Sequence, residues 1–438
     1  MLLVALRDAL WGMPLISLLL ISGGYFSIRL GFFQLHPIRI LQNTLGSLQK
    51  QRQNRKAMLA AVSTALGGTV GIGSITGVAY GIAVGGAGSL FWMWVSGFFG
   101  MALKYTEVFL AVKHRKKTKY GYVGGAPYAL RDMGYKKLGV LFALLCVFSS
   151  FGVGNLTQIG ALTQVTSGLG ISPLLCGGGC AALLAFAVWG GRERIGRWNT
   201  VLVPLASLLY LLVTVGIVIA HLPLLPGVFA RILQEAFGLD AAFGGISGSL
   251  MAIAMREGFA RGIFSNEAGV GSSPLAHASS GESDPIRQGE WGGFEILMDT
   301  FVVSTVTGLA LLCTEFADMT KLFGFAFGKP GVVLFAVLVA IFAFASILSW
   351  CYYSEVCLQF LALPHGETVY RILCVGCALA GACLSMDTIW ILADLLGGLM
   401  IFPNLFLLFQ KRNEVIYLQK KGTQRVVLTR KRNSTETT

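Results

Sequence analysis

Charged residues are scarce in this sequence. Only 13% of the 438 residues are Asp, Glu, Lys or Arg, whereas 55% are hydrophobic. An ordinary soluble domain has about 25% charged residues. Too little polar material remains to cover the surface of a large soluble protein. The composition therefore argues against a soluble enzyme and predicts a protein that lies in a membrane.

Clusters of catalytic or metal-binding groups are also missing. The five histidines are scattered without metal-ligand spacing, and the nine cysteines lie in or beside apolar segments. Cys374 and Cys377 have C-x-x-C spacing, but no second pair and no histidine accompanies them, so we interpret them as small core residues. With no nucleotide-binding loop and no convincing catalytic triad, the sequence predicts no enzyme, no cofactor and no bound metal other than a coupling ion.

Apolar runs of roughly 20 residues, the length that crosses a bilayer as a helix, recur along the whole chain. We predict eleven spans, at residues 9–28, 57–83, 89–112, 138–166, 171–190, 199–221, 242–277, 292–313, 331–360, 367–384 and 388–409. Span 1 follows Arg7 but has no clear cleavage site, so we expect it to be retained. The predicted fold class is an all-α polytopic membrane protein with about 11 transmembrane helices.

Basic residues explain the net charge of +13 and predict an orientation. They concentrate in the loops that follow spans 1, 3, 5 and 11, and all of these loops fall on one side of the membrane. Cytoplasmic loops carry an excess of Lys and Arg. We therefore expect a multi-pass protein of the cell inner (plasma) membrane with the N-terminus outside and the C-terminus in the cytoplasm. The partner that this charge implies is the lipid bilayer and not a nucleic acid.

Two of the predicted spans are interrupted by glycine-rich segments, at residues 67–77 and 261–273. Non-helical backbone is tolerated at membrane depth only where it lines a cavity or is buried in protein. A pair of interrupted helices in matching places of two halves points to the midplane site of a secondary transporter. Close packing of small residues between helices is the alternative for the first break. Ser265, Asn266 and Glu267 in the second break favour a functional site, because polar groups at this depth are costly.

Spans 2–6 and 7–11 form two sets of five, and each set opens with an interrupted helix. Because five is odd, the second set enters the membrane from the opposite side, which is an inverted repeat of the leucine-transporter type. We predict an extra N-terminal helix and cytoplasmic loop at 1–56, five-helix repeats at 57–221 and 242–409, and a basic cytoplasmic tail at 410–438.

Other polar residues within the spans admit more than one interpretation. Gln158 and Asn266 either contact a ligand or connect helices. Asp299 either bonds to a threonine or the backbone near the inner end of its span, or serves as a proton-coupling acid. Lys104 and Glu107 are one helical turn apart, and we expect them to pair and to extend toward the inner surface.

Several segments resemble the alanine/glycine–cation symporter family, whose members are sodium-coupled amino-acid carriers. They are residues 71–79, 91–94, 100–104, 111–115, 124–128, 152–155, 261–269, 274, 276–278, 299–300, 350–353, 398–400 and 403–405. The segment from Arg261 to Gly269 is the most specific of them, and together they extend over nearly the whole chain.

The resemblance implies a site for a small amino acid between the two interrupted helices. The substrate-binding residues that it implies are Gly71, Gly73, Ser74, Gln158, Phe264, Ser265, Asn266 and Trp350. Trp350 would wall the pocket for the substrate side chain. The sodium ion would lie between the first break and span 9, near Thr69, Gly71 and Ser346, where unwound carbonyls and hydroxyls supply the oxygen ligands that a hard cation prefers.

Five positions depart from the family pattern near this site, among them Ile391 and Gly397, where Asp and Asn are common. Ser74 stands where Asn is usual, Ala345 replaces one of two hydroxyl residues, and Ser349 stands where Gly is usual. They put the identity of the amino acid and the sodium stoichiometry in question. The expected function is a sodium-coupled symporter that imports a small neutral amino acid, alanine- or glycine-like, by alternating access. The alternatives are a proton-coupled transporter of the same fold and a non-transporting amino-acid receptor.

Overall fold

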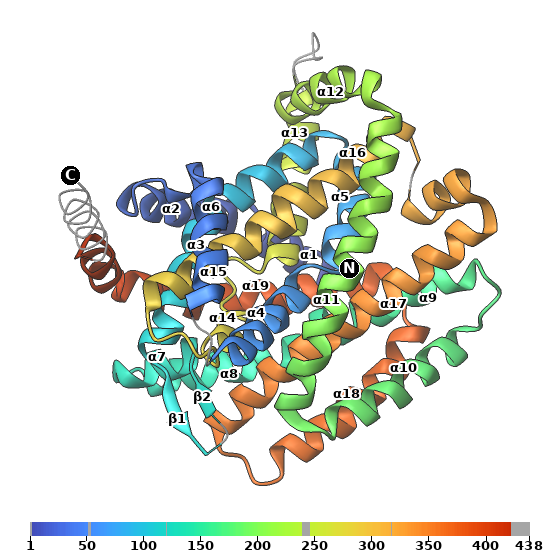
Figure 1. The fold of residues 1–438 in the computed structure, drawn as a ribbon. Helices are drawn as coiled ribbons and strands as arrows, with labels where there is room; N and C mark the ends of the chain where they lie inside the picture. The colour runs from blue at the N-terminus through green and yellow to red at the C-terminus, as the bar shows by residue number, and fades with distance from the viewer. Residues whose placement is uncertain (1, 51–53, 120, 239–245, 317, 422–438) are drawn as a thin grey trace.

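The computed structural model describes residues 2–50, 54–119, 121–238, 246–316 and 318–421, and this part of the chain is almost entirely helical (Figure 1). Because hydrocarbon offers no hydrogen-bond partners, a helix that satisfies its own backbone suits a sequence this apolar. Nine helical segments of the described chain are long and apolar enough to cross a membrane: Leu2–Arg29, Arg55–Gly85, Gly88–Lys113, Lys136–Ser167, Gly191–Ala220, Pro285–Thr314, Met319–Leu361, Gly366–Cys383 and Met386–Gln410. The predicted class, an all-α polytopic membrane protein, is thus confirmed.

Two of the eleven predicted spans are not among these nine. The span predicted at 171–190 corresponds to α10 (Pro173–Val188), which is apolar but short. The span predicted at 242–277 corresponds to α13 (Ile246–Asn266) and α14 (Pro274–His277), and its residues 242–245 lie outside the described chain. The count of eleven and the division into two repeats therefore stay predictions.

Most of the long segments consist of one or two helices. They are α1 (Leu2–Leu10), α2 (Met13–Arg29), α4 (Arg55–Thr69), α5 (Val78–Gly85), α6 (Gly88–Lys113), α8 (Lys136–Phe151), α9 (Thr157–Ser167), α11 (Gly191–Ala220), α15 (Pro285–Ile296), α16 (Thr305–Thr314), α17 (Met319–Leu361), α18 (Gly366–Cys383) and α19 (Met386–Gln410). Side chains cap the N-termini of several helices, including α10 and α17. Ser172 accepts a hydrogen bond from the Leu175 amide and Asp318 accepts one from the Lys321 amide, so each satisfies a donor of the first helical turn.

Shorter elements connect the long helices. They are η1 (Phe33–Leu35), α3 (Pro37–Lys50), α7 (Ala126–Asp132), η4 (Leu222–Leu224), α12 (Leu225–Phe237) and a helix at 412–421. The strands β1 (Lys116–Thr118) and β2 (Gly121–Val123) pair antiparallel in the basic loop after α6. The sequence alone predicted neither this hairpin nor the connecting helices α3 and α12.

Three of the long segments contain a π-helical stretch. These are η2 (Gly73–Gly77) between α4 and α5, η3 (Gly152–Leu156) between α8 and α9, and η5 (Leu297–Ser304) between α15 and α16. A π-helix accommodates more residues in each turn than an α-helix and occurs frequently at functional sites.

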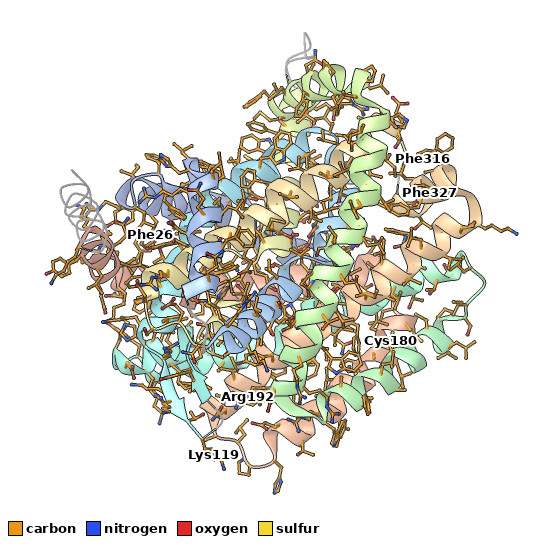
Figure 2. All side chains as sticks on the ribbon, in the orientation of Figure 1. Phe26, Lys119, Cys180, Arg192, Phe316 and Phe327 are labelled. Carbon is orange, nitrogen blue, oxygen red and sulfur yellow. The ribbon has the colours of Figure 1, made fainter. Side chains whose placement is uncertain are left out.

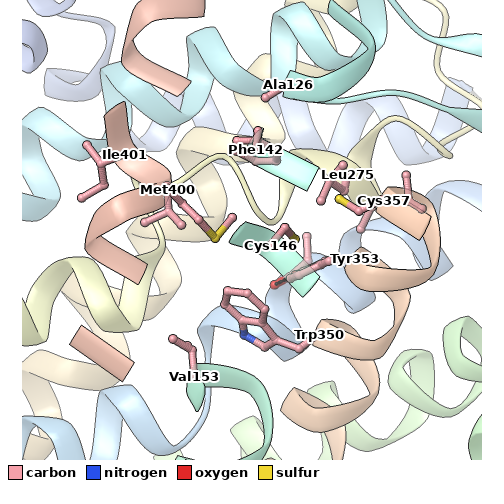
Figure 3. Packing of buried hydrophobic residues seen from close by; sticks show 14 of the residues in the cluster. Ala126, Phe142, Cys146, Val153, Leu275, Trp350, Tyr353, Cys357, Met400 and Ile401 are labelled. Atoms are coloured by element: carbon pink, nitrogen blue, oxygen red, sulfur yellow. Dashed lines mark hydrogen bonds between the residues drawn. The ribbon is translucent and has the colours of Figure 1, made fainter. Parts of the chain in front are cut away.

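The two interrupted helices lie in the interior of the bundle. Helix α13 packs against α6, α5 and η2, while α4 packs against α11 and α17. Figure 1 shows α11 crossing one face, with α10 and α18 side by side at its lower end. A large hydrophobic cluster surrounds Trp350, which lies between Val153 and Tyr353 in Figure 3. The interior is therefore closely packed around both breaks.

The outer faces of α10, α11 and α18 are apolar. Leu175 on α10, Leu212 on α11 and Ile372 on α18 are all more than half exposed. Such side chains extend outward from the ribbon around the labelled Cys180 of α10 (Figure 2). An apolar surface of this extent suits contact with lipid.

Candidate functional site

The first interruption occurs where the sequence predicts it. Helix α4 ends at Thr69, Val70 is extended (φ −76°, ψ 100°), and the helical path resumes as η2. Neighbouring residues pack closely against Gly71 and Gly73. A Cβ atom on Gly71 would lie 2.6 Å from Ser346 Oγ, and one on Gly73 would lie 2.8 Å from Ser265 Cα. Glycine at these two positions thus lets the first break meet α17 and the second interrupted helix.

The second interruption begins later than the sequence predicts. Phe264, Ser265 and Asn266 form the last turn of α13 and are not unwound, so that part of the prediction is wrong. The non-helical stretch is 267–273, in which Gly269 and Gly271 both have φ of 80°. These left-handed glycines turn the chain away from the helix axis, and α13 keeps its hydrogen bonds up to the amide of Glu267.

Asp299 joins the two interrupted helices. Ser74 Oγ in η2 and Ser265 Oγ in α13 donate to the same oxygen, Asp299 Oδ1, at 2.6 and 2.7 Å. The two hydroxyl oxygens are 3.1 Å apart, and Thr300 Oγ1 donates to Asp299 Oδ2 at 3.0 Å. All four residues are buried. The bond to a threonine was one of the alternatives predicted for Asp299, but its contacts with the two breaks were missed.

The residues that the resemblance implies for sodium lie around the start of the first break, where α4 ends. Ser346 Oγ on α17 donates to the carbonyl oxygen of Gly67 at 2.7 Å and lies beside Gly71. Thr69 Oγ1 instead bonds to carbonyl oxygens of its own helix, those of Ala65 and Leu66, each at 3.3 Å. Ser346 and Gly71 are therefore in contact, whereas the Thr69 hydroxyl points along α4.

Gln158 and Asn266 both bond within the protein. Gln158 Nε2 donates to the Val153 carbonyl and to Thr157 Oγ1, each at 3.2 Å, and its buried Oε1 atom has no hydrogen-bond partner among the described residues. Asn266 Oδ1 accepts from the Ala268 amide at 3.0 Å and Nδ2 donates to Thr300 Oγ1 at 3.2 Å. Asn266 thus holds the start of the non-helical stretch, and Gln158 Oε1 is an acceptor that the described residues leave unused.

Phe264 and Trp350 line a narrow cavity between α13, α17, η3 and α19. Its other lining residues are Trp11, Val153, Ile263, Glu267, Val270, Ala393, Asp394 and Gly397. About 20 Å³ of it can be reached by the centre of a water-sized sphere, which is room for a water molecule and not for an amino acid. The buried Trp350 Nε1 atom has no hydrogen-bond partner in the described part of the chain. The interior is therefore closed around the predicted pocket for the substrate side chain.

A buried ion pair, which the sequence did not predict, includes Asp394 from the lining of this cavity. Arg261 Nη2 on α13 contacts Asp394 Oδ2 on α19, and both side chains are almost fully buried. The guanidinium carbon of Arg261 lies 4.5 Å from the centre of the Trp390 ring. The pair connects the second interrupted helix to α19. Only the position of Arg261 in the glycine-rich segment pointed to it.

Lys104 and Glu107 do not extend toward the surface, and that prediction is wrong. Lys104 Nζ on α6 bonds to the Glu267 carbonyl at 3.1 Å, to Ser273 Oγ at 2.7 Å and to Glu295 at 3.4 Å. Glu107 is also buried and accepts a hydrogen bond from Asn404. Tertiary contacts explain why Lys104 stays in the interior. The segment after α13 folds back onto α6 and offers Lys104 oxygen partners in the interior.

The sequence matches the family model of the sodium:alanine symporter family over residues 1–432. The chain belongs to this family. It is 37% identical over 439 residues to an uncharacterized transporter of Haemophilus influenzae, with 96% of each chain covered. It is 35% identical over 415 residues to the sodium/alanine symporter AgcS of Methanococcus maripaludis, with 90% of this chain and 91% of that protein covered.

A third relative is a probable sodium/glutamine symporter, GlnT, of Bacillus subtilis. It is 33% identical over 419 residues, with 92% of this chain and 86% of the relative covered. Membership of the sodium:alanine symporter family identifies the chain as a membrane transporter of the symporter type and not as an enzyme.

Proposed function

We propose that the protein imports a small neutral amino acid together with sodium by alternating access. The observation that carries the proposal is the contact of two interrupted helices through Ser74, Ser265 and Asp299. Interrupted helices at the middle of a transporter bind substrate and coupling ion there. Charged and polar side chains in this setting are costly, so their presence favours a functional role.

The amino acid is proposed to bind among Gly71, Gly73, Ser74, Gln158, Phe264, Ser265, Asn266 and Trp350, and sodium among Thr69, Gly71 and Ser346. Support comes from the proximity of η2, α13 and α17 and from the acceptor that Gln158 leaves unused. The two proposed repeats, 57–221 and 242–409, would move relative to each other around this site. No cofactor other than the coupling ion is needed.

The energetics are adequate for uptake. One monovalent cation that moves down a potential of about 100 mV provides roughly 2.3 kcal/mol, and a tenfold sodium gradient adds about 1.4 kcal/mol. Together they allow a neutral solute to accumulate several hundredfold. Transport should therefore be inward and electrogenic.

The test is uptake of a panel of labelled amino acids into proteoliposomes, with and without a sodium gradient. Sodium-dependent uptake of alanine, glycine or a similar amino acid is expected. Uptake that survives the replacement of sodium at fixed pH would instead favour the proton-coupled alternative. Binding without any flux would favour a receptor.

Removal of the Ser346 hydroxyl should weaken the apparent sodium affinity. Ser346→Ala deletes an oxygen beside Gly71 and Gly67, and loss of one good contact should cost about 1–3 kcal/mol, or roughly 5- to 150-fold. The measurement is the sodium dependence of uptake. Ser22→Ala is the control, because Ser22 Oγ is also buried but bonds to the Leu18 carbonyl of its own helix. An unchanged sodium dependence in Ser346→Ala would remove Ser346 from the site.

The proposed orientation places the hairpin β1–β2, including Lys116, in the cytoplasm and the connection around Arg231 outside. The basis is the unequal distribution of Lys and Arg between the two sets of loops. Single cysteines at these positions, on a cysteine-free background, should label differently in intact cells. An impermeant reagent should label position 231 but not position 116. Labelling at position 116 would contradict the proposed orientation.

A further inference from the structure

Asp299 is a buried carboxylate without a basic neighbour. Three other buried carboxylates contact a basic side chain, as Glu295 does Lys104, Asp394 does Arg261 and Glu355 does Arg371. Two more, Glu107 and Glu267, accept hydrogen bonds from Asn404 and Ser272. For Asp299, no ion pair is present within the described chain, and its hydrogen bonds come from hydroxyl groups. An uncompensated buried charge is expensive, so a bound cation would stabilise the ionised form of this side chain.

Oxygen atoms from three elements lie within hydrogen-bond distance of one another at Asp299, and one cation can share them once the two hydroxyl groups turn their protons away from the carboxylate. Asp299 Oδ1, Ser74 Oγ and Ser265 Oγ form a triangle with sides of 2.6, 2.7 and 3.1 Å. The carbonyl oxygen of Thr69 lies 3.5 Å from Ser74 Oγ, and it belongs to the end of α4. Oxygen ligands from a carboxylate, hydroxyls and an unwound carbonyl are what hard cations select.

This cluster adjoins the place proposed above for sodium, because the Gly71 amide and the Thr69 carbonyl lie 3.4 and 3.5 Å from Ser74 Oγ, but it faces different helices. Gly71 faces Ser346 of α17, whereas Ser74 faces Ser265 of α13 and Asp299 of η5. The first break thus contributes to two groups of oxygen atoms, on two different sets of neighbouring helices. Both groups are closed to solvent, because Ser74, Ser265, Asp299 and Ser346 are at most 2% exposed.

We propose that Asp299, Ser74 and Ser265 form a second sodium site, so that two sodium ions move with each amino acid. The proposal rests on the sodium-coupled function proposed above and extends it to a stoichiometry. The carboxylate supplies the charge that the group around Ser346 lacks, and each serine belongs to a different interrupted helix. Sodium at this position therefore holds the two helices together while the substrate is bound.

Sodium alone can test the site without knowledge of the substrate. A ligand that binds only the folded protein raises its thermal midpoint. The midpoint of the purified full chain in detergent should be higher in sodium chloride than in potassium chloride of equal concentration. In Asp299→Asn this sodium-specific shift should fall to what the Ser346 group provides, and Ser346→Ala should retain the remainder. Glu355→Gln is the control, since it alters a buried carboxylate next to Arg371 and should keep the whole shift.

Transport measurements test the stoichiometry. In proteoliposomes the wild type should move two charges and two radioactive sodium ions for each neutral amino acid, with a sigmoidal dependence on sodium. Asp299→Asn should move one of each or lose coupling. If that variant fails to fold, Ser74→Ala is the alternative, because it keeps the charge of Asp299 and removes one oxygen. It should lower the apparent sodium affinity of uptake roughly tenfold.

The outcomes separate the two proposals. Absence of sodium-dependent uptake for every amino acid would overturn the proposed function. Sodium-dependent uptake with one charge and one sodium ion per amino acid would leave that function intact and overturn the second site. Two charges with a single sodium ion would also overturn it, because a proton would then occupy Asp299. An unchanged sodium-specific midpoint shift in Asp299→Asn would likewise show that no sodium ion binds at Asp299.

Discussion

Replacement of Asp394 by alanine is expected to destabilise the protein by about 3–5 kcal/mol, since it breaks a buried ion pair and leaves Arg261 with the more distant Glu257 carboxylate, 3.9 Å from Nε, as its partner within the described chain. The guanidinium of Arg261 would then remain in the interior with its side chain about 1% exposed. Its Nε and Nη1 atoms already lack a hydrogen-bond partner within the described chain. The measurement is the unfolding midpoint in detergent.

Two further variants serve as a control and as a rescue for Asp394→Ala. Asp132→Ala breaks the half-exposed pair with Lys116, and surface pairs contribute about 0–1 kcal/mol. The double variant Arg261→Met with Asp394→Ala removes both charges and should recover much of the lost stability. If Asp394→Ala were as stable as Asp132→Ala, the Arg261–Asp394 contact would not be a buried ion pair in solution.

Alanine at position 73 should strongly impair transport. Its methyl group would lie 2.8 Å from Ser265 Cα, so the two interrupted helices would have to separate. Overpacking of this kind costs about 1–3 kcal/mol, which corresponds to roughly 5- to 150-fold in an equilibrium. The separation would also disturb the contact of Ser74 with Ser265. The measurement is sodium-driven uptake by proteoliposomes that contain equal amounts of protein.

Gly77→Ala provides the matched control. Gly77 is the last residue of the same π-helical segment, and the nearest atoms to an added methyl group lie at 3.8 Å, an ordinary contact. This variant should transport like the wild type. Equal impairment in both variants would show that any methyl group in η2 is harmful, and that the contact between Gly73 and Ser265 is not the cause.

The interruption of the first helix could be predicted from sequence because its cause is local. Glycines concentrated at 67–77 within an apolar run leave few other interpretations, and the helix does stop at Thr69. In the second helix the same reasoning placed the unwound backbone too early. Residues 264–266 remain helical because the left-handed residues that turn the chain, Glu267, Gly269 and Gly271, all follow them.

The polar contacts of the interior could not be predicted in the same way. Lys104 and Glu107 are neighbours on one helix face, and spacing alone favours their pairing. Their actual partners, Glu295 and Asn404, are more than 190 residues away in sequence. Likewise, one serine in each break was visible in the sequence, but their common partner Asp299 emerges only when three helices meet.

The π-helical segments have a consequence for movement. Each wide turn stores one residue more than the α-helix around it needs, and η2 and η5 meet at Ser74 and Asp299. If such a turn tightens, the surplus residue passes to the next turn, and the helix beyond it rotates without losing its hydrogen-bonded backbone. The extra residues that the proposed alternating access would use are therefore already present in the helices that hold Ser74 and Asp299, and they can be used one residue at a time.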